Sequence, residues 1–255
     1  MPKKLMMITA AGLALTAAQA NAQDYYLAGN IGLVQMGDSS NSGDLTQDVV
    51  LGLGAGTLTD QAAYVFDTDF EVGVFSSIAI GKTTAYGPFR SELEFSFTRN
   101  DVRDHDDLQA LGGSLQDADI AVLTGGMTPA GLTVGRAFED AQGSVKTYGF
   151  MVNGYYDFAV SSPNVHPYVG VGIGALNTKV HYNPSRLGVA DDSATTFGYQ
   201  LMAGVDFDTS ARTVLHAGFR YRGSQPVEVE ADAIPSDLEV DINQFVAEIG
   251  YRWKF

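Results

Sequence analysis

Hydrophobic and polar residues alternate with a period of two in eight stretches of the chain. Successive residues of a β-strand point to opposite faces of a sheet, so the alternation predicts strands with one apolar and one polar face. The pattern is most regular in residues 89–100, 197–207, 215–222 and 245–255. It is less regular in residues 25–36, 69–81, 144–158 and 166–180. We therefore expect an all-β fold with eight principal strands.

The connections between these stretches alternate in length. The short ones are residues 82–87, 159–165 and 209–211, and the long ones are residues 37–68, 101–143, 181–194 and 224–239. Most of the stretches have roughly 10–15 residues, enough for a tilted membrane-spanning strand of about 9–11 residues. Outer-membrane barrels have short periplasmic turns and long extracellular loops. The pattern predicts a closed, antiparallel, up-and-down transmembrane β-barrel of eight strands with both chain ends in the periplasm.

Two alternatives stay open at this point. The apolar faces would also suit the core of a soluble sandwich, and residues 49–58 or 119–135 offer a further hairpin that would make ten strands. Aromatic residues favour the membrane barrel, because they gather near both strand ends, where the membrane interfaces would lie. The predicted periplasmic group is Tyr25, Phe89, Tyr156, Phe158, Phe207, Trp253 and Phe255. The predicted outer group is Phe70, Phe97, Tyr148, Phe197, Tyr221 and Phe245.

The first 22 residues have the pattern of a secretory signal peptide. Lys3 and Lys4 form a positive start, residues 5–18 are apolar, and Ala20-Asn21-Ala22 is a cleavage site of the small-x-small kind. The apolar stretch is too short to span a membrane, which takes about 20 residues as a helix. We expect residues 1–22 to be a signal peptide and residues 23–255 to be the exported barrel domain.

Several stretches resemble a known family. The segment EIGYRWKF (248–255) looks like the closing strand of outer-membrane proteins, with a terminal Phe and apolar residues at every second position. FRSELEFSFTRNDV (89–102), GSVKTYGFMVNGYYDF (143–158), HPYVGVGIGAL (166–176), FGYQLMAGVDF (197–207) and LHAGFRYRG (215–223) resemble small Gram-negative outer-membrane barrels, the opacity-protein and major-surface-antigen-like porin family. The resemblance implies location in the outer membrane among lipid and lipopolysaccharide. It also implies recognition by the barrel-assembly machinery through Ala247, Ile249, Tyr251, Trp253 and Phe255.

Composition narrows the range of partners and cofactors. The formal net charge is −15, which argues against nucleic acid as a partner, because phosphate binding needs clustered Lys and Arg. The chain contains no Cys, so disulfides and Cys-based metal or redox sites are excluded. No phosphate-binding glycine motif is present, and we expect no cofactor.

Polar residues on the strand faces opposite the apolar ones are expected to point into the barrel. Unpaired buried charges are costly, so such residues should pair with one another. An eight-stranded barrel has a lumen that side chains can just fill, so we expect a plugged interior. The predicted interior set is Arg90, Glu92, Glu94, Gln200, Asp206, His216, Arg220, Arg222, Glu248 and Arg252.

The long connections are rich in acidic residues. Residues 37–68 contain Asp38, Asp44, Asp48, Asp60 and Asp67, and residues 224–241 contain Glu228, Glu230, Asp232, Asp237, Glu239 and Asp241. Carboxylates suit divalent cations, but the spacing matches no calcium loop, and solvated acidic loops are the favoured interpretation. Residues 104–107, Asp-His-Asp-Asp, offer one His beside acids, which is a weak metal signal, and we expect no metal site.

Three functional hypotheses follow. The favoured one is a non-enzymatic barrel that stabilises the cell envelope and displays loops for interaction with host or extracellular ligands, as antigens and adhesins of the resembled family do. The alternative is a narrow porin-like channel for ions or small solutes. The third is a barrel enzyme acting on lipid A or on peptides; His216 is the one His inside a regular strand, and no Ser–His–acid grouping accompanies it, so no catalytic residue is assigned.

Overall fold

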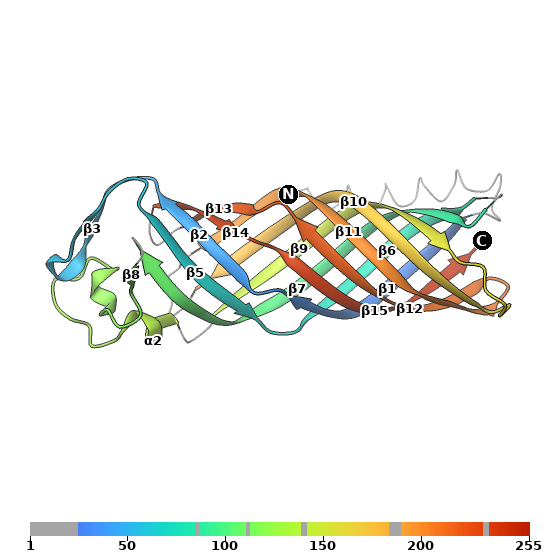
Figure 1. Ribbon diagram of the computed structural model, residues 1–255, viewed down its shortest axis with the longest axis horizontal. Helices are drawn as coiled ribbons and strands as arrows, with labels where there is room; N and C mark the ends of the chain where they lie inside the picture. The colour runs from blue at the N-terminus through green and yellow to red at the C-terminus, as the bar shows by residue number, and fades with distance from the viewer. Residues whose placement is uncertain (1–24, 85–86, 111–112, 139–141, 184–189, 232–234) are drawn as a thin grey trace, which may run out of the picture.

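The computed structural model describes residues 25–84, 87–110, 113–138, 142–183, 190–231 and 235–255, most of which form antiparallel β-sheet. The predicted signal peptide lies outside these residues. The molecule is elongated, and its strands run obliquely along the long axis (Figure 1). The longest strands are β1 (Tyr25–Met36), β6 (Gly73–Thr83), β7 (Phe89–Ala110), β9 (Gly143–Asp157), β10 (Val165–Tyr182), β11 (Ala190–Ser210), β12 (Thr213–Ser224) and β15 (Asn243–Lys254).

Each of these eight strands pairs with two others of the eight, always antiparallel. The pairings run in the order β1, β6, β7, β9, β10, β11, β12 and β15, and β15 pairs again with β1. Each of the eight stretches that the sequence predicts as strands overlaps a strand of this series, although the stretch 69–81 begins four residues before β6. The prediction of an all-β antiparallel fold is therefore confirmed.

The long connections differ from the prediction, because much of their length is strand. Residues 37–68 contain β2 (Ser39–Leu45) and most of β5 (Ala63–Phe70), and residues 224–239 contain β13 (Val227–Ala231) and most of β14 (Ser236–Val240). These four strands connect β7 to β11 through the pairings β7–β5, β5–β2, β2–β14, β14–β13 and β13–β11. The sheet thus continues beyond the ends of β1, β6, β12 and β15, and we call this part the extension.

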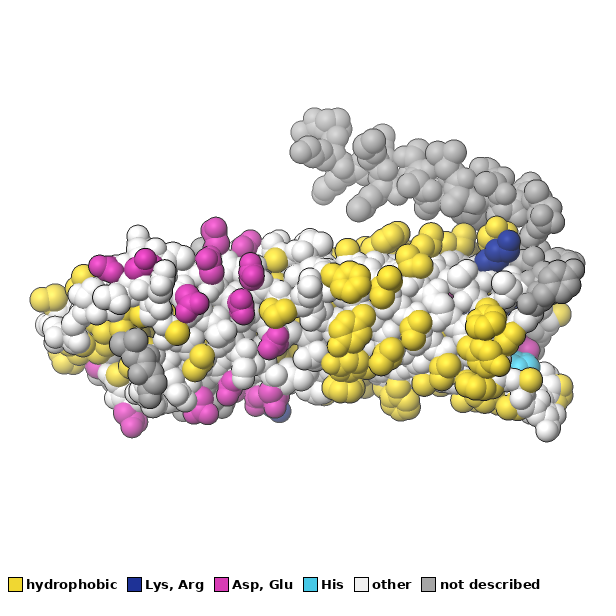
Figure 2. Space-filling view, turned by 45° about the horizontal axis from the view of Figure 1, so that its top comes forward, with side chains coloured by type: hydrophobic (Ala, Val, Ile, Leu, Met, Phe, Trp, Pro, Cys, Tyr) yellow, Lys and Arg dark blue, Asp and Glu magenta, His cyan; other side chains and the backbone are white. Residues whose placement is uncertain are grey.

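The side-chain pattern inverts between the two parts of the sheet. In the eight-strand series the exposed face carries large apolar residues such as Ile31, Ile78 and Phe219. In the extension the buried face is apolar, with Phe66, Val229 and Leu238 in one cluster, and the exposed face carries acids. Figure 2 shows hydrophobic side chains over one half of the molecule and Asp and Glu over the other. An apolar outer face, as in the eight-strand series, is compatible with surrounding lipid. An apolar buried face with acids outside, as in the extension, is compatible with surrounding water.

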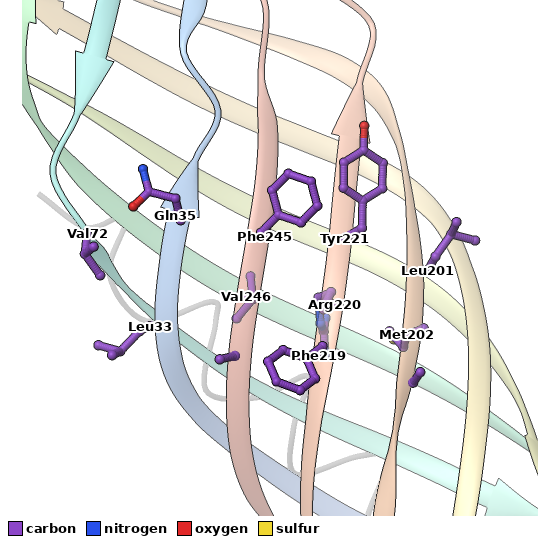
Figure 3. A pocket seen from close by; sticks show the side chains of 12 residues that line it. Leu33, Gln35, Val72, Leu201, Met202, Phe219, Arg220, Tyr221, Phe245 and Val246 are labelled. Atoms are coloured by element: carbon purple, nitrogen blue, oxygen red, sulfur yellow. The ribbon is translucent and has the colours of Figure 1, made fainter.

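A close view of the apolar surface shows the alternation directly. Where β1, β15, β12 and β11 run side by side, Leu33, Phe219 and Phe245 line a shallow depression on the outer face (Figure 3). Arg220 and Val246 are the next residues along β12 and β15, and they are 2% exposed. A one-residue step along a strand therefore takes the chain from the lipid-compatible face to the interior.

The remaining elements lie in connections at the end of the molecule that the extension forms (Figure 1). Residues 49–58 form a separate hairpin of β3 (Val49–Leu51) and β4 (Gly56–Leu58), with the 3-10 turn η3 (Gly52–Gly54) between them. After β8 (Gly113–Ser114), the chain forms η4 (Ile120–Val122) and α2 (Val134–Phe138). Among the described residues, no helix is both long and apolar enough to cross a membrane. Neither region that offered a further hairpin adds a strand to the eight-strand series.

Asp119 organises the connection that contains η4 and α2. Its carboxylate accepts hydrogen bonds from the backbone N–H groups of Ala121 (2.9 Å), Ala130 (2.9 Å) and Gly131 (2.8 Å). These bonds, first of all that from Ala130, lower the pKa of the Asp119 carboxyl. One acidic side chain thus ties the start of η4 to a loop about ten residues further along the chain.

This geometry predicts that the connection loosens in acid. Because the pKa of Asp119 is lower in the folded state, its stabilising effect is present above the unfolded pKa of about 3.9 and is lost as pH falls through the folded value. Hydrogen exchange of residues 119–134 should therefore show lower protection well below about pH 3.9 than at pH 7. Asp119→Asn should show the lower protection at both pH values, whereas Asp117→Asn, at an exposed neighbour, should behave as the wild type. Equal protection of the Asp119→Asn and wild-type proteins at pH 7 would contradict the assignment.

Candidate functional site

The ten residues predicted to face the interior are all buried, with exposed fractions between 0% and 7%. They come from β7, β11, β12 and β15. The set contains four arginines and four carboxylates, so its formal charges balance. The structure brings nine of the ten into two groups joined by ion pairs and hydrogen bonds, one nearer the extension and one nearer the C-terminus.

The first group is centred on Arg220. Its guanidinium donates to Glu94 and, at 3.1 Å, pairs with Glu248. Arg222 lies 3.5 Å from the same Glu94 and donates to Gln200 at 3.2 Å. Gln200 in turn donates to Glu94 at 3.3 Å. Two cations and two carboxylates thus share one hydrogen-bonded group, which is the arrangement that makes buried charge tolerable.

The second group lies nearer the C-terminus. Arg90 donates to Asp157 at 2.8 Å and lies 3.5 Å from Asp206, which also accepts from Arg252 at 2.9 Å. Glu92 lies 3.9 Å from Arg90. Asp157, which is not in the predicted set, lies at the end of β9 and is partly exposed.

Aromatic side chains complete the interior, and the sequence prediction did not include them. The hydroxyls of Tyr26 and Tyr155 donate to Glu92 at 2.8 and 2.9 Å. Arg90 lies over the ring of Tyr155 at 4.6 Å, and Arg220 over the ring of Phe75 at 4.8 Å, measured to the ring centroids. These rings occupy inward positions of strands whose outward positions are also apolar. The sequence could have predicted them from the alternation of strand faces: Tyr156 faces outward, so its neighbour Tyr155 must face inward.

Glycines on the inward face make room for the large side chains. A Cβ at Gly172 would lie 2.1 Å from Asn153 Oδ1, and a Cβ at Gly218 would lie 2.6 Å from the Tyr168 hydroxyl. Both distances are far below van der Waals contact, so any other residue at these two positions would have to displace an interior side chain. The alternating glycines of β10 therefore reflect close filling of the interior.

His216 is directly opposite Asp206 in the register of β11 and β12, but no ion pair among the described residues joins it to either charged group. Its ring packs edge-on against Tyr168, with 6.5 Å between the centroids. Its Nδ1 atom has no hydrogen-bond partner among the described residues. A hydrolytic His needs a group that orients the ring and a nucleophile within reach. The described surroundings of His216 supply no carboxylate at Nδ1.

His105, from the weak metal signal at residues 104–107, faces the apolar interior of the extension. Its ring lies edge-on against Phe66, Phe138 and Tyr182, and Nδ1 forms a 2.9 Å hydrogen bond with Thr68. The described residues contain no group of three or more His, Asp or Glu placed to hold a metal ion.

The acids predicted to lie in loops lie mainly on the outer face of the extension or at its edges. Asp44 is on β2, Asp67 on β5, Glu228 and Glu230 on β13, and Asp237 and Glu239 on β14. Asp237 is directly opposite both Asp44 and Glu230 in the register, and Glu228 is opposite Glu239. Asp38 and Asp241 lie between strands, Asp48 and Asp60 lie in the first connection, and Asp232 is outside the described residues. The prediction that these acids lie in loops was wrong for the six that lie on strands. The prediction that they are solvated agrees with their position on the outer face.

An apolar cavity of about 320 Å³ lies at the outer end, between the extension and the connection that contains η4. Its polar lining groups already have partners, since Tyr64 bonds to Ser236 and Thr124 donates to the Ile120 carbonyl. Water would find few hydrogen-bond partners there, so we expect the cavity to stay dry. The other lining residues are Leu45, Leu58, Ala62, Ala63, Phe66, Leu108, Ala110, Leu115, Ile120, Leu123, Phe138 and Ala231.

Comparison with known proteins is consistent with this architecture. The family model described as "Outer membrane protein beta-barrel domain" matches residues 6–253. Among solved structures, the outer membrane protein OprG from Pseudomonas aeruginosa is similar over 92% of this chain and 96% of its own, with 16% identity and a TM-score of 0.54. Neisserial surface protein A covers 91% of this chain and 97% of its own, with 15% identity and a TM-score of 0.45. No curated protein sequence matches the chain.

Proposed function

Because this chain belongs to the outer membrane protein β-barrel domain family and is therefore a protein of the bacterial outer membrane, we propose that β1, β6, β7, β9, β10, β11, β12 and β15 form a closed, eight-stranded transmembrane barrel. The apolar outer face and the cyclic series of pairings support it. We further propose a non-enzymatic role, in which the barrel stabilises the envelope and the extension is presented outside the cell. In this scheme residues 1–22 are removed on export.

The observation that carries the proposal is a contact across the interior. β7 and β12 stand four places apart in the cyclic order of eight, so they are opposite walls. Arg220 and Arg222 of β12 nevertheless reach Glu94 and Ser96 of β7, the latter at 2.9 Å. Side chains that join opposite walls leave little room for a continuous water path, which is the condition expected of a small barrel. The same contact disfavours the porin-like alternative.

The closing strand supplies the proposed assembly signal. Ile249, Tyr251 and Trp253 are exposed by 60%, 47% and 42%, and they alternate with buried Glu248 and Arg252. An apolar stripe on the outside of the last strand is accessible to another protein before the barrel inserts. We propose that Ala247, Ile249, Tyr251, Trp253 and Phe255 are recognised there by the assembly machinery.

Planar-bilayer recording is the direct test of the closed interior. The detergent-refolded protein should migrate differently before and after boiling, as folded barrels do, and it should show no steady conductance steps. A boiled sample that no longer gives the folded band serves as the control. Steady steps from protein that gives the folded band would replace the structural proposal with the channel alternative. Protein that is soluble without detergent and shows no band shift would overturn the membrane barrel.

The envelope role is tested in cells. Deletion of the gene should make cells more sensitive to detergent and to EDTA, and expression of the wild-type protein should restore resistance. A variant that folds into the membrane but lacks the extension should separate envelope stability from surface interaction. Unchanged sensitivity of the deletion strain would contradict an envelope-stabilising role.

A further inference from the structure

A row of three cations crosses three neighbouring strands on the outer face. Arg99 of β7 is directly opposite Lys146 of β9, and Lys146 is directly opposite Lys179 of β10. Residues directly opposite in an antiparallel pair have Cβ atoms about 4.5–5.5 Å apart, and like charges so placed repel. The register therefore places three positive side chains next to one another in a chain whose formal net charge is −15.

The row lies at a defined level of the barrel. The next row of outward residues, towards the end of the molecule where the C-terminus lies, consists of Phe97, Tyr148 and Asn177. In the register, Tyr148 is directly opposite both Phe97 and Asn177. The rings of Phe97 and Tyr148 are 5.2 Å apart between centroids. Aromatic residues mark the membrane interface, so the three cations lie just outside it, at the height of the lipid headgroups of the outer leaflet.

Among the described residues, the acidic partners of the row lie on the side away from the membrane. Arg99 pairs with Asp101 at 2.8 Å, and Lys179 pairs with Asp191 at 2.8 Å; all four side chains are about half exposed. Asp101 and Asp191 belong to the next outward row of the strands. Exposed pairs of this kind are weak and exchange readily with other anions. Lys146, in the centre of the row, has no ion pair within the described residues.

We propose that Arg99, Lys146 and Lys179 bind the phosphate groups of outer-leaflet lipid, specifically the phosphates of lipopolysaccharide. An anion between Lys146 and its two neighbours relieves their mutual repulsion. Arg contributes two parallel hydrogen bonds to a phosphate, and Lys contributes a compact charge. The aromatic row beneath contacts the start of the acyl chains. This inference rests on the transmembrane barrel proposed above and adds a lipid site to it.

The test is native mass spectrometry of the refolded full-length protein in detergent. It compares the binding of phosphorylated lipid A with that of fully dephosphorylated lipid A that has the same acyl chains. The wild type should prefer the phosphorylated lipid by at least about tenfold, because each cation near an anionic surface is expected to contribute roughly fivefold. Lys146→Gln should reduce the preference roughly fivefold. The triple variant R99Q/K146Q/K179Q should lose it.

Arg103→Gln is the matched control. Arg103 lies on the same strand and is exposed, but it is outside the row and pairs with Asp69 at 3.2 Å, so its replacement should leave the preference unchanged. A preference retained by the triple variant, or lost equally in Arg103→Gln, would overturn the site. Complete displacement of the lipid by millimolar inorganic phosphate would overturn the lipid assignment in favour of a free-anion site. Every variant is first checked for the heat-dependent band shift, and failure of the wild type in that check would count against the barrel itself.

Discussion

Replacing Arg220 by Gln should destabilise the folded barrel by about 3–5 kcal/mol, the usual cost of leaving a buried charge without its partner. Arg220 is 2% exposed and forms ion pairs with both Glu94 and Glu248. Without it, two buried carboxylates face Arg222 alone, so the group carries a net negative charge in the interior. The free energy of unfolding, measured by urea titration of the protein in lipid vesicles, should fall by this amount.

Charge balance gives this prediction a stringent control. Glu94→Gln in the Arg220→Gln background leaves one cation, Arg222, and one anion, Glu248, so the double variant should be more stable than Arg220→Gln alone. Arg212→Gln, at an exposed site in the turn between β11 and β12, should change the unfolding free energy by less than about 0.5 kcal/mol. If Arg220→Gln and Arg212→Gln behave alike, or if the second substitution deepens the loss, the interior group does not act as a balanced set.

The interior was predictable because the lipid-facing pattern fixes strand parity. Once Phe95 and Phe97 are assigned to the outer face, Glu94 must point inward, and the same logic places Arg220 between Phe219 and Tyr221. Parity alone does not say which charges meet. The contact of Arg220 with Glu94 joins β7 and β12, which stand four places apart in the series of pairings, so it can be foreseen only from the complete order of strands. Interior aromatics such as Phe75 were missed because an aromatic residue in a membrane strand is expected to face lipid.

The extension was not predicted, although its signal is present in residues 227–240. Val227 and Val229 alternate with Glu228 and Glu230, and Leu238 and Val240 alternate with Asp237 and Glu239. The acids dominated the interpretation, since blocks of like charge are usually solvated loops. An interruption in the alternation of inward and outward residues also made β1 and β2 hard to recognise as one continuing part of the sheet. Met36 and Ser39 both face inward although they are three residues apart, because Gly37 and Asp38 interrupt the strand between them.

Leu238→Asp should therefore unfold the extension while the eight-strand series stays intact. Leu238 is fully buried in the apolar cluster of the extension, so a carboxylate there would lie among apolar side chains. Burial of such a charge costs several kcal/mol, more than a few short strands can offset. Hydrogen exchange should accelerate by more than about a hundredfold in residues 39–45, 227–231 and 236–240 and change little in residues 245–254, with the heat-dependent band shift preserved.

Asp237→Asn, one residue away on the outer face of the same strand, is the matched control for Leu238→Asp. It removes a charge that faces Asp44 on one side and Glu230 on the other, so it should slow exchange in the extension or leave it unchanged. Opposite responses at adjacent positions would establish that the extension is a sheet with its own apolar interior, which unfolds separately from the eight-strand series. Equal acceleration throughout the chain in Leu238→Asp would instead show that the two parts fold as one cooperative unit.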